Sequence, residues 1–342
     1  MSKICKHPFN SIQIQNTGEV YCCCCYWTNF YSFGNIFEQS FDEIWNGEKA
    51  QKFREQFLKQ EFKYCKLNEC EPFLPDKDYK PSLVCEYPKQ IEFSYDRRCN
   101  VRCIFCRNEI NKEEEIYNRE KEHKIEKNFD SIFTPILERA EIVELNSAGE
   151  LFASKHSIEI VKKVIKINPN IKFKIISNGI LFTKEIIEAL DLKERMITVT
   201  ISMHSATEKT YNKLVKHGNF KKLIENVKYL SQLKKQGSLQ NLQLNFVVTS
   251  INYNEMIKFA HFAKEMEAKA FFINYHRQID DNKLEKELDI SLPTNKNYNK
   301  LIKILKNPIF NENYCYVNDY LKNLKPISQN FLNLFNIKGR IK

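Results

Sequence analysis

Three cysteines lie close together in the first third of the chain, in a pattern that favours metal chemistry. Cys99, Cys103 and Cys106 occur in the run C-N-V-R-C-I-F-C, directly after the apolar segment 90–95. Three thiolates within eight residues can hold three corners of a cubic iron–sulfur cluster, whose fourth iron then has no protein ligand. Clusters that only carry electrons or support a fold are normally held by four cysteines. The spacing therefore predicts an open iron, which is a place for chemistry.

The same cysteines admit a second interpretation, a zinc site with its fourth ligand elsewhere, such as Cys85. Zinc ligands usually come in C-x2-C pairs, whereas here the first gap holds three residues. The chain contains twelve cysteines, and in a reducing cytosol such a number argues for metal ligation rather than disulfides. The four consecutive cysteines 22–25 agree, because a disulfide framework usually spreads its cysteines out.

Length and charge limit the class of protein. The chain has 342 residues, 42% of them hydrophobic, which is enough for one large domain and a smaller one. We expect a cytoplasmic protein with no membrane partner, because residues 1–10 carry no apolar stretch and no segment reaches the roughly 18 apolar residues of a membrane span. The net charge is +10, but lysines alternate with glutamates along predicted helices, so we do not expect nucleic-acid binding.

The elements that position the three cysteines alternate between strand and helix. This order predicts parallel strands joined by crossovers, and six units fit a partial (β/α)6 TIM-like barrel of the α/β class. A doubly wound sheet would share the alternation, but no G-x-G-x-x-G follows any strand. The expected strands are 90–95, 141–146, 171–176, 196–202, 242–249 and 270–275, and the expected helices are 129–139, 154–167, 183–190, 219–234 and 254–267.

The barrel, predicted over residues 81–278, is flanked by two other regions. Residues 1–80 predict a small cysteine-rich α+β domain, with a strand pair at 11–15 and 19–21. A capping box at Ser40–Glu43 predicts a helix that runs to about Tyr64, and a proline-punctuated linker follows it. Residues 279–342 form a C-terminal extension that could cap the barrel.

Polar residues follow the predicted strands, at the edge where parallel barrels place their chemistry. Cys99 follows the first strand and Gly149-Glu150 the second, and similar positions end the other four. These are Ser177-Asn178-Gly179, then Ser202 and His204, then Val248-Thr249, then Tyr275-His276-Arg277.

With Phe105 just before the third cysteine, this pattern resembles the radical S-adenosylmethionine (radical SAM) superfamily, in which SAM chelates the open iron of a [4Fe–4S] cluster. Asn146–Glu150 looks like the family's Gly-Gly-Glu motif, with Ala148 in place of the first glycine. Tyr211–Gly218 resembles Tyr-x-x-x-x-Arg-x-Gly, with Lys216 where arginine is usual. The resemblance implies SAM contacts from Phe105, Gly149, Glu150, Ser177, Asn178, Ser202, Lys216 and Val248, and substrate contacts from His204, Tyr275, His276 and Arg277, and it identifies no catalytic acid or base.

The N-terminal region is similar to a SPASM domain, which carries auxiliary [4Fe–4S] clusters and usually follows the barrel rather than preceding it. The similarity rests on Cys5–Phe9, Gly18–Cys23, Phe33–Ile36, Ser40–Asn46, Cys65 and Cys70. It implies one auxiliary cluster, with a structural zinc as the alternative. The implied ligands are Cys5, Cys23, Cys65 and Cys70, and Cys22 or Cys24 could replace Cys23.

The two resemblances imply an oxidoreductase or maturase. It would cleave SAM reductively to a 5′-deoxyadenosyl radical that abstracts hydrogen from a peptide or protein side chain. A one-electron reductant such as flavodoxin or ferredoxin would be its partner. Two alternatives stay open: modification of a small polar substrate such as an aminosugar or sugar nucleotide, and a non-enzymatic zinc protein that binds nucleic acid.

Overall fold

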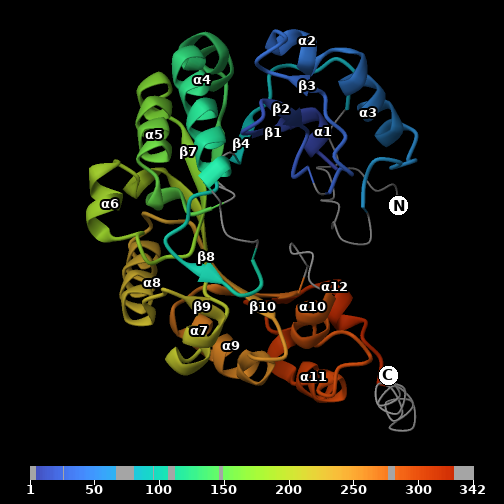
Figure 1. Ribbon diagram of the computed structural model, residues 1–342, viewed down its shortest axis with the longest axis vertical. Helices are drawn as coiled ribbons and strands as arrows, with labels where there is room; N and C mark the ends of the chain where they lie inside the picture. The colour runs from blue at the N-terminus through green and yellow to red at the C-terminus, as the bar shows by residue number, and fades with distance from the viewer. Residues whose placement is uncertain are drawn as a thin grey trace. The chain divides into compact units, whose positions relative to one another are not determined.

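The structure is a computed structural model that describes residues 5–25, 27–66, 81–94, 96–106, 112–145, 149–275 and 282–326. The chain divides into two compact units (Figure 1). The first contains Met1–Arg98 and Ile110–Ile175, and the second contains Cys99–Glu109 and Ile176–Lys342.

The sheet of the first unit joins the cysteine-rich region to the start of the barrel. Its strand order is β3-β2-β1-β4-β6-β7, and β1 pairs in parallel with β4 over five residues, from Ser11↔Gln90 to Gln15↔Ser94. β4, β6 and β7 are parallel, whereas β1, β2 and β3 form an antiparallel meander. The strands are β1 (Ser11–Gln15), β2 (Glu19–Tyr21), β3 (Gly34–Asn35), β4 (Gln90–Ser94), β6 (Ile142–Leu145) and β7 (Lys172–Ser177).

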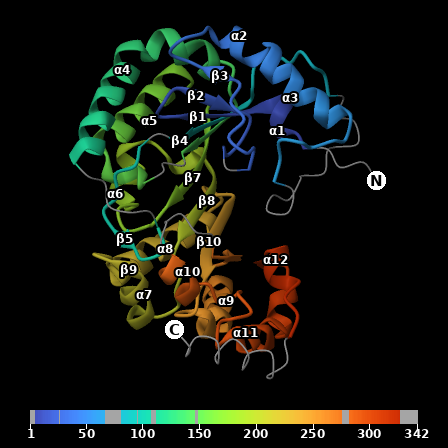
Figure 2. The same cartoon turned by 45° about the vertical axis from the view of Figure 1, so that its right-hand side comes forward.

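Alternation along these strands sends apolar side chains to the helices. Phe93 of β4 meets Phe133 of α4 edge to face, with ring centroids 5.5 Å apart, and α4 and α5 lie side by side in both views (Figures 1 and 2). The helical elements are α1 (His7–Asn10), α2 (Phe41–Trp45), α3 (Glu48–Leu58), α4 (Lys112–Leu137), η1 (Leu151–Ala153) and α5 (Lys155–Ile167).

Two helix predictions need correction. The Ser40–Glu43 capping box is present, but the single helix expected to run to about Tyr64 is in fact α2 and α3. The helix is interrupted at Gly47, where a Cβ atom would lie 2.0 Å from the carbonyl oxygen of Glu43. α4 begins at Lys112 rather than at 129, because the highly charged first half of this helix has no apolar stripe to reveal it.

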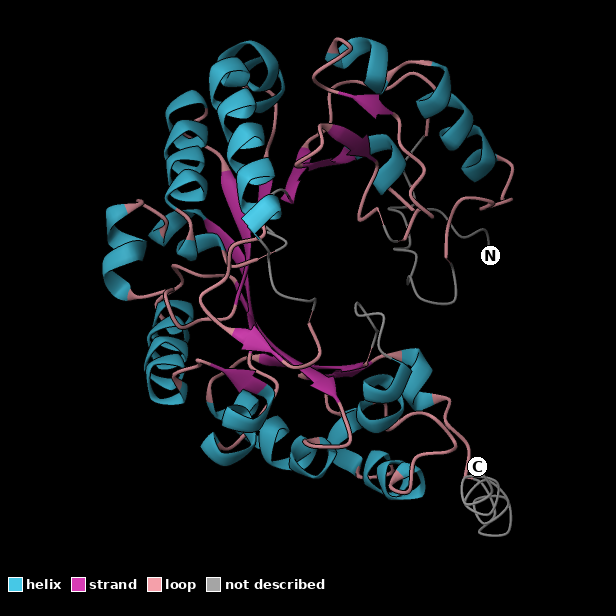
Figure 3. Ribbon diagram, in the orientation of Figure 1, coloured by secondary structure: helices cyan, strands magenta, loops and turns pink. Residues whose placement is uncertain are grey.

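The second unit continues the alternation of strand and helix. Its parallel strands follow the order β8-β10-β11-β12, and Figure 3 shows them flanked by helices. Phe246, Phe259 and Phe272 form its aromatic core, with centroids 4.8–5.7 Å apart. The strands are β5 (Arg102–Cys103), β8 (Met196–Ser202), β9 (Val215–Lys216), β10 (Asn241–Val248), β11 (Lys269–Asn274) and β12 (Cys315–Val317).

The C-terminal extension does more than the sequence predicts, because β12 adds a parallel strand beside β11. α7, β5 and β9 are also absent from the sequence-based expectations. The helical elements of this unit are α6 (Lys184–Ala189), η2 (Lys193–Arg195), α7 (Glu208–Leu214), α8 (Phe220–Lys235), η3 (Tyr253–Glu255), α9 (Met256–Glu265), α10 (Asn282–Leu288), α11 (Tyr298–Leu305), η4 (Pro308–Asn311) and α12 (Asp319–Lys322).

The α/β class and the six predicted barrel strands are confirmed, each strand to within a residue at either end. The domain boundaries at 80 and 278 stay predictions. Within the described ranges, no helix combines the length and the apolar character that crossing a membrane requires.

Candidate cofactor site

The three-cysteine loop belongs to the second unit, where Cys99 and Cys106 lie near enough to Cys103 to act electrostatically on its thiol. No three described His, Cys, Asp or Glu side chains enclose a single metal ion here. Burial, together with the neighbouring charges of Cys106 and Cys99, raises the pKa of the Cys103 thiol to about 12. A thiol is a metal ligand only as a thiolate, and bound iron supplies the positive charge that such a buried group lacks. The donor set therefore fits an iron–sulfur cluster.

A short antiparallel pair fixes the middle of the loop. β5 pairs with β9 so that Cys103 lies opposite Val215 and Arg102 opposite Lys216. The Ile104 N–H donates to the Leu214 carbonyl at 2.9 Å. The Lys216 side chain is exposed. The pairing of its backbone with Arg102 ties the segment Tyr211–Gly218 directly to the cysteine loop.

In the segment Tyr211–Gly218, the last residue packs against the ring of the first. Tyr211 is 1% exposed, and a Cβ atom at Gly218 would lie 2.6 Å from its ring carbon Cε1. Glycine is thus required where Tyr211 packs, which gives the spacing between the two residues a structural reason.

Asn178 contacts the first cysteine of the loop. Its Nδ2 lies 3.8 Å from Cys99 Sγ and donates to Asn100 Oδ1 at 2.8 Å. Ser177 is buried, and its Oγ accepts from the Gly179 N–H at 2.9 Å. Gly179 has φ +78°, a left-handed conformation that suits glycine. The Ser-Asn-Gly turn therefore directs Asn178 at the loop, while Ser177 holds the turn.

His204 supports the loop from within the fold. Its ring meets Phe105 edge to face at 4.9 Å, and its Nδ1 accepts from the Val247 N–H at 3.2 Å. Burial lowers the pKa of His204 to about 4, so the imidazole is neutral at physiological pH. This arrangement is that of a packing residue, and the predicted substrate role of His204 stays a prediction.

The remaining predicted residues of this unit lie at strand ends. Ser202 pairs in register with Asn245, and Val248 is buried at the end of β10. Tyr275 is buried directly after β11, whereas His276 and Arg277 lie outside the described residues.

In the first unit, Gly149 and Glu150 pack against the backbone that leads into Cys99. A Cβ atom at Gly149 would lie 2.1 Å from the Arg98 carbonyl oxygen, so only glycine fits. The Glu150 N–H donates to that same oxygen at 2.7 Å. Glu150 is 1% exposed, and its carboxylate caps η1 by accepting from the Phe152 N–H. Residues 146–148 of the motif lie outside the described residues.

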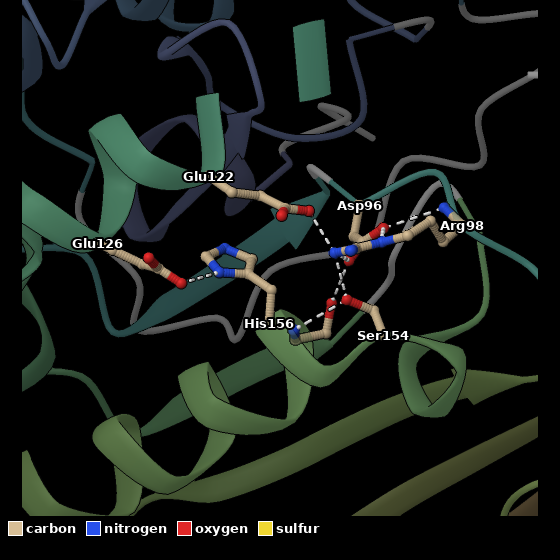
Figure 4. A network of polar contacts seen from close by, with 7 residues as sticks. Asp96, Arg98, Glu122, Glu126, Ser154 and His156 are labelled. Carbon is tan, nitrogen blue, oxygen red and sulfur yellow. Dashed lines mark hydrogen bonds and ion pairs between the residues drawn. The ribbon is translucent and has the colours of Figure 1, made fainter. Parts of the chain in front are cut away.

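A polar network, not anticipated from the sequence, holds Arg98 itself (Figure 4). Buried Asp96 accepts from the Arg98 backbone N–H at 3.0 Å and from its Nη2 at 2.7 Å. The guanidinium also bonds Glu122 and Ser154. Burial alone would raise the pKa of Asp96, but hydrogen bonds from Arg98 and Ser154 hold it below its ordinary value. The sequence contained one signal of this network: Asp96 lies two residues before Arg98, and Arg98 directly precedes the first cysteine.

A second set of thiols gathers in the cysteine-rich region of the first unit. Cys22 is fully buried, and its Sγ lies 3.7 Å from Cys23 Sγ. Burial raises the pKa of Cys22 well above its ordinary value, and Cys23, Cys5 and Cys65 raise it further. The thiols therefore converge, although no three described His, Cys, Asp or Glu side chains enclose a single metal ion. The ligand role of Cys23, or of Cys22 or Cys24 in its place, stays a prediction, and Cys70 lies outside the described residues.

Comparison with known families agrees with both thiol sets. A model described as the radical SAM superfamily matches residues 94–263, and a model of the SPASM iron–sulfur cluster-binding domain matches residues 5–71. The chain therefore belongs to the radical SAM superfamily and carries its SPASM domain ahead of the barrel. It is an enzyme of that class, and the two domains imply [4Fe–4S] clusters together with SAM.

Individual relatives are more distant. A GTP 3′,8-cyclase from Thermodesulfovibrio yellowstonii is 30% identical over 205 residues, which cover 57% of this chain and 58% of that protein. The solved structure of native anSMEcpe with bound AdoMet is 18% identical and covers 67% of this chain and 63% of its own, with a TM-score of 0.46. For the same protein with AdoMet and the Cp18Cys peptide, the sequence identity is 19%, the match covers 67% of this chain and 62% of that chain, and the TM-score is 0.45.

Gly149→Ala should weaken SAM binding by at least about tenfold, because the new methyl group displaces the Arg98 carbonyl and with it the start of the cysteine loop. Titration of SAM into the anaerobically reconstituted protein measures this. Gly237→Ala is the matched control, since its Cβ would meet nothing within 4 Å. Equal affinities of the two variants would contradict the proposed role of the close approach.

Asp96→Asn should destabilise the protein by about 1–2 kcal/mol at pH 7, a figure reduced by the partial exposure of Arg98. Since the folded-state pKa of Asp96 is lowered, its contribution is complete above about pH 4 and disappears as the pH falls through the folded-state value. Urea denaturation of both proteins at neutral and acidic pH tests this.

The matched control is Asp191→Asn, which removes a carboxylate from a surface pair with Arg195 and should cost at most about 1 kcal/mol. A difference between wild type and Asp96→Asn that did not shrink in acid would contradict the assignment.

Proposed function

We propose that this chain cleaves SAM reductively and uses the resulting radical to abstract hydrogen from a peptide or protein side chain, as an oxidoreductase or maturase. The observation that carries the proposal is the loop that holds Cys99, Cys103 and Cys106, in which the first and last cysteines both act electrostatically on the buried Cys103 thiol. The side-chain substrate is inferred from the SPASM domain at residues 5–71.

When bound, the [4Fe–4S] cluster with SAM supplies the electron transfer and the 5′-deoxyadenosyl radical. The protein supplies ligands, position and a dry environment. The three cysteines would hold the cluster, and Asn178 directs an amide N–H toward the sulfur of Cys99. Phe105 and neutral His204 fill the space behind the loop with apolar or uncharged groups, which limits the access of water.

The SAM contacts that we propose follow from the resemblance to the family's motifs. Gly149 and Glu150 would contact the SAM amino group. The other proposed SAM contacts come from Phe105, Ser177, Asn178, Ser202, Lys216 and Val248. In the cysteine-rich region, Cys5, Cys23, Cys65 and Cys70 are the proposed ligands of an auxiliary cluster, with Cys22 or Cys24 as the alternative to Cys23. A flavodoxin or ferredoxin would be the reductant.

A second candidate substrate is a small polar molecule such as an aminosugar or sugar nucleotide. The sheet face of the first unit opposite α4 and α5 carries several hydrogen-bonding side chains beside Ile142. Gln90 donates to Glu144 at 3.0 Å and accepts from Lys174 at 2.9 Å, and Gln13 donates to Glu92 at 2.5 Å. The relative named as a GTP 3′,8-cyclase favours the same direction.

Cys103→Ala should abolish 5′-deoxyadenosine formation by reconstituted, dithionite-reduced protein, and should leave about four of the roughly eight irons per chain. Chromatography of the nucleoside products and iron analysis measure the two effects. Cys315→Ala is the matched control, because Cys315 lies in β12, outside both cysteine sets, and should leave both values unchanged. Full activity of Cys103→Ala would refute the site.

The two substrate classes differ in their response to protease. If the substrate is a peptide or protein, a cell extract that stimulates 5′-deoxyadenosine formation should lose that effect after digestion and protease removal. Stimulation that survives digestion and resides in the small-molecule filtrate would support the polar-molecule alternative and contradict the side-chain assignment.

A further inference from the structure

Gln56 is a buried polar residue with half of its amide unused. It lies on α3 and is 4% exposed. Its Oε1 accepts from the Tyr64 N–H at 3.0 Å, whereas its Nε2 has no hydrogen-bond partner in the described part of the chain. A buried donor left without an acceptor costs about 1–3 kcal/mol, so such a group calls for an explanation.

The orientation of the amide is fixed by its surroundings. Tyr64 N–H needs an acceptor, so turning the amide over would set two donors against each other and gain nothing for Nε2. The Tyr64 ring is itself held by Tyr31 and Phe53, with centroids 4.1 and 5.8 Å away. The backbone carbonyl of Gln56 accepts from the Glu61 N–H at 2.9 Å, which folds the following loop back onto the helix. The free donor is thus held in place rather than mobile.

The residue after Tyr64 is Cys65, which belongs to the converging thiols. The charges of Cys65 and Cys5 both raise the pKa of the fully buried Cys22 thiol. The Gln56 amide thus holds the backbone of Tyr64, the residue that directly precedes a proposed ligand of the auxiliary cluster. Sulfur atoms of a bound cluster, either cysteine thiolates or bridging sulfides, are acceptors that the protein alone does not offer there.

We propose that Gln56 is a positioning residue for the auxiliary cluster, and that its Nε2–H donates a hydrogen bond to a cluster sulfur. The inference rests on the proposed assignment of a cluster to these thiols. Hydrogen bonds to the sulfurs of an iron–sulfur cluster stabilise its reduced, more negative state and so raise its reduction potential. Gln56 would accordingly set how readily this cluster accepts an electron.

The test isolates the auxiliary cluster in a full-length protein that carries Cys99→Ala, Cys103→Ala and Cys106→Ala together. In that background, redox titration monitored by electron paramagnetic resonance should give the auxiliary cluster a more negative midpoint potential in the Gln56→Met variant than in the protein that keeps Gln56. Pulsed resonance of the reduced cluster should show coupling to a side-chain amide nitrogen that Gln56→Met lacks.

The matched control is Gln51→Met, which removes an amide on the same helix that donates to the Asn46 carbonyl. It should lose comparable stability but keep both the potential and the coupling. An unchanged potential in Gln56→Met, as expected if Nε2 bonds a buried water, would overturn the proposal. Absence of the coupling with Gln56 present, or of any cluster in the triple-alanine background, would overturn it even if Gln56→Met does not fold.

The readouts need neither SAM nor substrate. Failure of the Gln56 proposal therefore leaves the radical reaction standing, and loss of 5′-deoxyadenosine formation in Cys103→Ala is decided separately.

Discussion

The backbone carbonyl of Arg98 is the point on which the cofactor site depends. It accepts the Glu150 N–H, and it lies so close to Gly149 that no side chain fits between them. The Arg98 side chain is meanwhile bonded to Asp96, Glu122 and Ser154, from the strand-end loop, α4 and the start of α5. One residue is therefore fixed through both its backbone and its guanidinium. The next residue is Cys99, so the residue that directly precedes the cysteine loop is held firmly within the first unit.

The loop itself is held by different forces. β5 and β9 contribute backbone hydrogen bonds, Asn178 an amide, and the Phe105–His204 pair an aromatic contact. None of these neutralises the charge of three thiolates, and the raised pKa of Cys103 shows how strongly burial disfavours the ionised form. Metal binding and thiol ionisation are thus coupled at this site.

The sequence predicts the framework well, because barrel strands are short apolar runs at regular intervals. It also locates the cysteine loop, since spacing alone restricts which metals three thiols can bind. The sequence does not reveal two features of the helices. The first half of α4 is charged and has no apolar stripe, and the interruption at Gly47 depends on a close approach to the Glu43 carbonyl. The bonds of Arg98 to Glu122 and Ser154 and the role of Gln56 were not predicted, because partners distant along the chain leave no local pattern. For Asp96, the only signal was its position two residues before Arg98.

The N-terminal region shares a continuous sheet with the barrel. Through its pairing with β1, strand β4 has a neighbour on each side, and its apolar residues are covered. A chain that lacked residues 1–80 would present the backbone donors and acceptors of β4 to solvent, and exposed strand edges invite association with other chains. The SPASM region of this protein is consequently more than a carrier of thiols, because its strand β1 also completes the sheet beside β4.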